Sequence, residues 1–90
     1  MALTQNIYAT QKIVRESLRS VGVDRIGSDA VDRISGTINE EIERMIISDR
    51  NAMVERIVSI GKKLRSILEK VDRSTAVVND VDLALDLEKD

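Results

Sequence analysis

The chain has 90 residues, of which 42% are hydrophobic and 33% charged, and its net charge is −2. It contains no Cys and no His, which excludes disulfides, thiol nucleophiles and any site that depends on imidazole. No apolar stretch is long enough to cross a membrane. We therefore expect a single all-α domain over residues 1–90 in the cytoplasm, with a core built from aliphatic side chains.

A first helix is predicted from about residue 4 to residue 21. Its apolar residues recur at helical spacing, which places them on one face. They are Ile7, Val14, Leu18 and Val21. Thr4 suits the N-cap, and Gly22 follows the last apolar position, where helices commonly stop. Residues 23–27 then predict a short extended connector.

The central part of the chain predicts a long helix over residues 28–70. Ser28 opens it, and Asp29 lies in the first turn, where the helix dipole favours an acid. Its second half carries a heptad seam that is typical of a coiled coil. The seam residues are Met53, Ile57, Ile60, Leu64, Ile67 and Val71.

This helix is too long for a compact molecule of this size. One helix over residues 28–70 would measure about 65 Å, whereas a compact chain of this length has a diameter of about 30 Å. Two arrangements resolve the conflict. In the first, the chain is an elongated dimer or larger oligomer that buries the seam against a second copy. In the second, residues 48–51 form a turn, and the chain is an antiparallel four-helix bundle.

A polar connector and a short last helix complete the chain. Residues 72–75 predict a turn, and a short β-branched stretch follows it. The last helix is predicted over about residues 79–88. The expected order is therefore helix, connector, long helix, connector and short helix.

The two connectors carry residues that resemble those of the histone fold of archaeal and core histones. In that family the first connector holds an Arg after a Gly, and the second holds Arg-Lys-Thr followed by an Asp in the last helix. Arg25, Arg73, Thr75 and Asp80 match these positions. Ser74 stands where the family has Lys, and the long helix would exceed the family's central helix by about two to four turns.

The resemblance implies both a fold and a mode of binding. The two connectors would pair as a short parallel β-bridge between the chains of a head-to-tail dimer. Arg73 and Asp80 would form a structural clamp, and Arg25 would reach toward a DNA minor groove with Thr75 beside it. The expected DNA-binding residues are Arg19, Arg25, Lys62, Lys63, Arg73 and Thr75.

The residues present do not suggest an enzyme, a metal site or a cofactor site. The acidic residues near Glu40 lack accompanying His residues. Asp80 and Asp82 lack the Gly and the spaced ligands of a calcium loop, and no Gly-rich phosphate loop occurs.

Two functions remain. The first is a histone-like dimer that binds double-stranded DNA through backbone phosphates and would be associated with the nucleoid. The second is a helical protein–protein assembly module that uses the seam and does not bind DNA. The net charge of −2 means that DNA binding would need a local basic surface.

Overall fold

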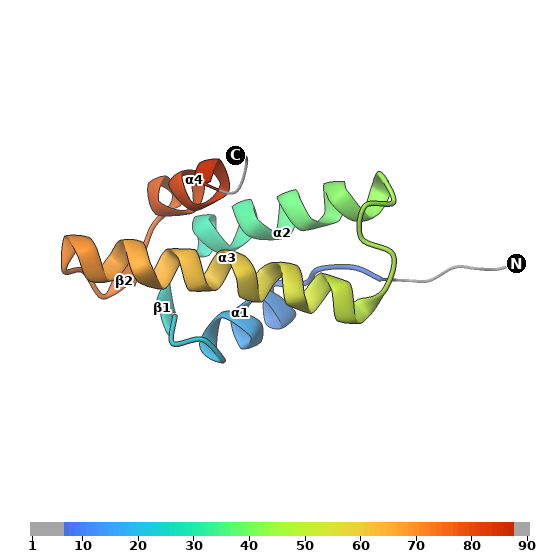
Figure 1. The fold of residues 1–90 in the computed structure, drawn as a ribbon. Helices are drawn as coiled ribbons and strands as arrows, with labels where there is room; N and C mark the ends of the chain where they lie inside the picture. The colour runs from blue at the N-terminus through green and yellow to red at the C-terminus, as the bar shows by residue number, and fades with distance from the viewer. Residues whose placement is uncertain (1–6, 88–90) are drawn as a thin grey trace, which may run out of the picture.

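A computed structural model describes residues 7–87 of the chain. In this range it has four α-helices and a two-stranded parallel bridge (Figure 1). The elements are α1 (Gln11–Arg19), β1 (Arg25–Ile26), α2 (Ser28–Glu43), α3 (Arg50–Val71), β2 (Thr75–Ala76) and α4 (Val78–Leu87). The helices α2 and α3 form a hairpin, and α1 and α4 each contact both of its arms from opposite sides.

The first helix is shorter than the sequence predicted. Residues 7–10 are not helical, and the N-cap is Thr10, whose hydroxyl accepts a hydrogen bond from the Ile13 N–H at 3.3 Å. Thr4, the predicted cap, lies outside the described residues. The predicted stop is confirmed, since Gly22 takes a φ of +91° and the Val23 N–H closes the helix end on the Leu18 carbonyl at 3.0 Å.

The prediction of one continuous helix over residues 28–70 is wrong. The chain leaves helical geometry after Glu43 and re-enters it at Arg50, so residues 44–49 form a joint at which it folds back. Asp49 caps the new helix by accepting the Ala52 N–H at 2.8 Å. The alternative of a fold-back is therefore correct, although the turn occupies residues 44–49 rather than 48–51. The cap that Asp49 provides favours a new helix start at Arg50 more strongly than the apolar pattern favours a continuous helix.

The seam assigned to a partner chain is buried within this chain. Met53, Ile57, Ile60, Leu64 and Ile67 all lie in the hydrophobic core, whereas Val71 is 50% exposed. Because the hairpin places this face of α3 against the chain's other helices, the seam does not offer a surface to a second copy. The seam itself therefore gives no reason to expect an oligomer.

The two connectors pair in parallel, as the resemblance implied, but they do so within one chain. Arg25 lies opposite Thr75, and Ile26 lies opposite Ala76. The Gly27 N–H extends the ladder by donating to the Ala76 carbonyl at 3.1 Å. The predicted bridge between two chains is thus replaced by an intrachain bridge, because the turn at 44–49 returns the second connector to the first.

The bridge register relates two similar halves of the chain by an offset of about 50 residues. Each half consists of a helix, a strand and a second helix. The first helix of each half, α1 or α3, is followed by a residue with positive φ, Gly22 after α1 and Asp72 after α3. The Leu68 carbonyl closes the second helix end by accepting the Arg73 N–H at 3.0 Å, just as Leu18 closes the first. Within residues 7–87, the identical residues at an offset of 50 are Ile7 and Ile57, Lys12 and Lys62, Arg15 and Arg65, Leu18 and Leu68, Val21 and Val71, Val31 and Val81, and Asp32 and Asp82.

Two helical glycines give a matched test of this packing. A Cβ at Gly36 would meet nothing within 4 Å, so Gly36→Ala should stabilise the fold by up to about 1 kcal/mol through helix propensity. A Cβ at Gly61 would lie 2.7 Å from Val21 Cγ2 and 3.0 Å from Leu18 Cδ2. Gly61→Ala should therefore destabilise by about 1 kcal/mol despite the same propensity gain. Urea unfolding measures both, and equal stabilisation by the two would contradict the close approach of α1 and α3.

Candidate nucleic-acid interface

The paired connectors present two side chains outward, next to one another. Along the bridge, Ile26 and Ala76 are buried, while their neighbours Arg25 and Thr75 are exposed. This alternation follows from strand geometry, in which successive side chains point to opposite faces. Arg25 and Thr75 are also register partners. Thr75 thus lies beside Arg25, as the resemblance implied, but within one chain rather than between two chains of a dimer.

The predicted clamp between Arg73 and Asp80 is present. Arg73 Nη2 lies 2.5 Å from Asp80 Oδ1, and the other carboxylate oxygen accepts the Val77 N–H at 3.0 Å. The Asp80 side chain is only 5% exposed, and that of Arg73 is 44% exposed. One buried carboxylate thus fixes both the second connector and the start of α4.

A small hollow of about 290 Å³ lies beside the bridge and brings three arginines together. Its lining residues are Gly22, Asp24, Arg25, Arg65, Leu68, Glu69, Arg73 and Ser74. Arg25 comes from β1, Arg65 from α3 and Arg73 from the second connector, so the fold-back is what assembles them. Residues of both connectors line the hollow, and Figure 1 shows these connectors at the opposite end of the hairpin from the 44–49 turn.

Arg65 is the basic residue of this hollow that the predicted DNA-binding set left out. Its guanidinium donates to the Val21 carbonyl at 3.3 Å and pairs with Glu69, also at 3.3 Å. The sequence did contain a signal, because Arg65 lies one helical turn after Lys62 on the same face of α3. The contact that brings Arg65 to the connector depends on the approach of α3 to the end of α1, which the sequence did not reveal.

The four other predicted DNA-binding residues, which are Thr75 of the bridge and three basic residues, do not line the hollow. Arg19 is exposed in the last turn of α1, Lys62 is exposed on α3, and Lys63 is partly buried. The predicted basic set is therefore divided, with Arg25 and Arg73 at the hollow and Arg19, Lys62 and Lys63 outside its lining.

Of the three arginines that line the hollow, Arg25 is the one whose charge is free to bind an anion. Within residues 7–87 its side chain makes no ion pair or hydrogen bond. Arg65 and Arg73 are held by Glu69 and Asp80 respectively. An anion entering the hollow would thus meet one uncommitted guanidinium and two that are already positioned by carboxylates.

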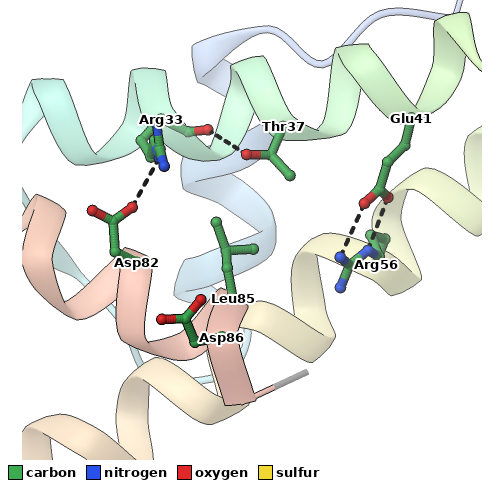
Figure 2. A pocket seen from close by; sticks show the side chains of 7 residues that line it. All are labelled: Arg33, Thr37, Glu41, Arg56, Asp82, Leu85 and Asp86. Atoms are coloured by element: carbon green, nitrogen blue, oxygen red, sulfur yellow. Dashed lines mark hydrogen bonds and ion pairs between the residues drawn. The ribbon is translucent and has the colours of Figure 1, made fainter. Parts of the chain in front are cut away.

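A larger hollow of about 500 Å³ lies among α2, α3 and α4, and four of its five charged side chains form two pairs (Figure 2). Arg56 binds Glu41 through two hydrogen bonds of 2.9 and 3.0 Å, which join α3 to α2. Arg33 Nε lies 2.9 Å from Asp82 Oδ1, which joins α2 to α4 as an ion pair without hydrogen-bond geometry. These contacts fasten the two halves of the chain to one another.

Within residues 7–87, no group of three or more acidic, His or Cys side chains could hold a metal ion. No helix in this range is both long and apolar enough to span a membrane. Comparisons with protein-family models, with curated proteins and with solved structures gave no match.

Proposed function

We propose that the paired connectors bind the phosphate backbone of double-stranded DNA, as a single-chain version of the connector surface that the histone resemblance implies. The observation that carries this proposal is the register of the bridge, which places Arg25 opposite Thr75. An exposed guanidinium beside an exposed hydroxyl offers two donors to neighbouring phosphate oxygens. The Arg73–Asp80 clamp supports the proposal by holding the second connector in place.

The charge balance of the hollow makes this binding weak and sensitive to salt. Its three arginines face the carboxylates of Asp24 and Glu69, and the whole chain carries a net charge of −2. Few phosphates can be neutralised per chain, so few counterions are released. Binding should therefore be detectable at low ionic strength and fade near physiological salt.

Arg25→Ala is expected to weaken DNA binding and to flatten its salt dependence. The loss of one phosphate contact reduces the slope of log affinity against log salt by about one unit. Fluorescence anisotropy with a labelled duplex at several salt concentrations measures both the affinity and the slope. Since Arg25 is exposed and has no side-chain partner within residues 7–87, the variant should keep wild-type stability.

Arg44→Ala is the matched control, since Arg44 is also exposed but follows α2 at the opposite end of the hairpin. It should bind DNA like the wild type. Equal DNA affinities of the Arg25→Ala and Arg44→Ala variants would contradict the proposal that the connector surface binds DNA. Absence of binding by the wild type at low salt would reject the DNA proposal itself.

Assembly through the heptad seam is not carried forward as a second function. Five of its six residues are buried inside the chain, and Val71 alone is exposed. A seam that is already packed against the chain's own helices has no apolar area left for a partner.

A further inference from the structure

The second connector places a free hydroxyl at the hollow that the three arginines line. Ser74 lies between Arg73, which a buried carboxylate holds, and Thr75 of the bridge. Ser74 is exposed, and within residues 7–87 its hydroxyl makes no hydrogen bond. The hydroxyls of Ser20 and Ser35, by contrast, each donate to a backbone carbonyl. The Ser74 hydroxyl is therefore not needed for the fold.

The charged side chains of the hollow suit a phosphate group beside this hydroxyl. Arg25, Arg65 and Arg73 reach the hollow from three separate segments, and its carboxylates are those of Asp24 and Glu69. Arg65 and Arg73 already hold carboxylates, whereas Arg25 has no side-chain partner within residues 7–87. A phosphoserine carries a charge of about −1.5 to −2 and three acceptor oxygens, which pair well with clustered arginines. The free guanidinium of Arg25 is thus the counter-charge that such a phosphate would meet.

The second connector is also accessible to an enzyme. Residues 72–75 are all exposed, and residues 73 and 74 belong to neither a helix nor a strand. An enzyme can bind an exposed irregular segment of this kind without unfolding a helix.

We propose that Ser74 is a phosphorylation site and that the three-arginine hollow binds the phosphate. A protein kinase transfers the γ-phosphoryl group of a nucleoside triphosphate to Ser74 Oγ. The Oγ–P bond forms as the bond from that phosphorus to the β-phosphate oxygen breaks, the hydroxyl proton passes to the kinase's base, and a nucleoside diphosphate leaves. The phosphate then pairs with Arg25, so that DNA no longer meets a free guanidinium there. This last consequence rests on the proposed function, whereas the phosphorylation and the place of the phosphate do not.

A titration of the phosphate tests its contact with the arginines without any DNA. Phosphoserine is incorporated at position 74, and its phosphorus NMR shift is followed against pH. Because neighbouring guanidiniums favour the dianion, the midpoint should lie roughly half a pH unit below that of a free phosphoserine. Adding Arg25→Ala should return the midpoint at least halfway to the free value, since it removes the uncommitted guanidinium.

Phosphoserine at position 48 is the matched control. Ser48 is exposed and lies in the 44–49 turn, at the opposite end of the hairpin from the hollow. Its midpoint should be the same with and without Arg25→Ala. A midpoint at position 74 that is likewise insensitive to Arg25→Ala would contradict binding of the phosphate by the hollow.

Fluorescence anisotropy with a labelled duplex tests the consequence for DNA. Phosphoserine at position 74 should weaken binding about tenfold at low salt, because it adds negative charge and removes one phosphate contact. The same modification at position 48 should have a much smaller effect. A chain phosphorylated at position 74 that binds as tightly as the unmodified chain would overturn this consequence. Absence of binding by the unmodified chain would reject the DNA proposal, whereas the titration would still decide whether the hollow holds the phosphate.

Labelling in a cell extract tests whether the modification occurs. An extract of the cells that produce the protein is supplied with a nucleoside triphosphate that is radiolabelled on its γ-phosphate. The wild-type chain should be labelled, and Ser74→Ala should carry at most about a tenth of that label. Since Ser74 is exposed, the variant should fold like the wild type, which circular dichroism checks. Equal labelling of the two chains, or no labelling of the wild type, would overturn the assignment of Ser74 as a phosphorylation site.

Discussion

Simultaneous replacement of Ile60 and Leu64 by Asp is expected to unfold the chain rather than to release a folded monomer. Both side chains are 0% exposed in the core of a single chain. A buried, unpaired carboxylate at such a position costs about 4–5 kcal/mol or more. The two together approach or exceed the entire stability of a domain of this size, about 5–15 kcal/mol. Far-UV circular dichroism should show loss of helix at all protein concentrations.

Val71→Asp is the matched control, because Val71 is the last residue of the same heptad pattern but is half exposed. Its replacement should cost less than about 1 kcal/mol and leave the circular dichroism spectrum unchanged. If the Ile60/Leu64 variant were instead a folded, helical monomer, the seam would face a partner chain after all. That result would contradict the burial of this face within the hairpin.

Asp80→Ala is expected to lower the stability by about 2 kcal/mol, which corresponds to a fall in Tm of roughly 8–16 °C. The carboxylate is buried and serves two partners, the Arg73 guanidinium and the Val77 N–H. Its removal leaves the first turn of α4 without a cap and Arg73 without its counter-charge. The contribution of the ion pair is moderate, because the Arg73 side chain is 44% exposed and partly screened by water.

Asp80→Asn separates the two contributions of Asp80. An amide oxygen can still accept the Val77 N–H, but the charge that holds Arg73 is lost, so about half of the destabilisation should remain. Thermal unfolding of Asp80→Ala, Asp80→Asn, Arg73→Ala and the double variant gives the coupling energy directly. A coupling near zero would show that Arg73 does not clamp the connector.

The connector features were predictable from sequence because each depends on residues close together in the chain. Gly22 stops a helix through its own backbone freedom, and Asp80 both caps α4 and reaches Arg73, seven residues earlier. The start of α2 at Ser28 and the short extended segment before it also follow from local preferences. The predicted start of the first helix was less accurate, because the sequence offers two threonines that could cap it. The structure has Thr10 as the N-cap of α1, whereas the sequence analysis chose Thr4.

The sequence by itself determined that the chain is helical, that its apolar face on residues 53–67 must be buried, and that two short connectors separate the helices. Only the tertiary structure decided which helices bury that face and whether the two connectors pair within one chain or between two chains. The reason is physical: a heptad pattern specifies that a face leaves water, but it is the same whether the covering helix belongs to this chain or to another. The choice depends on residues 44–49, where the cap of Asp49 and the left-handed turn at Met45 compete with continuous helix. The gathering of Arg25, Arg65 and Arg73 around one hollow follows from that choice, because it brings residues 40 and more positions apart to the same end of the molecule.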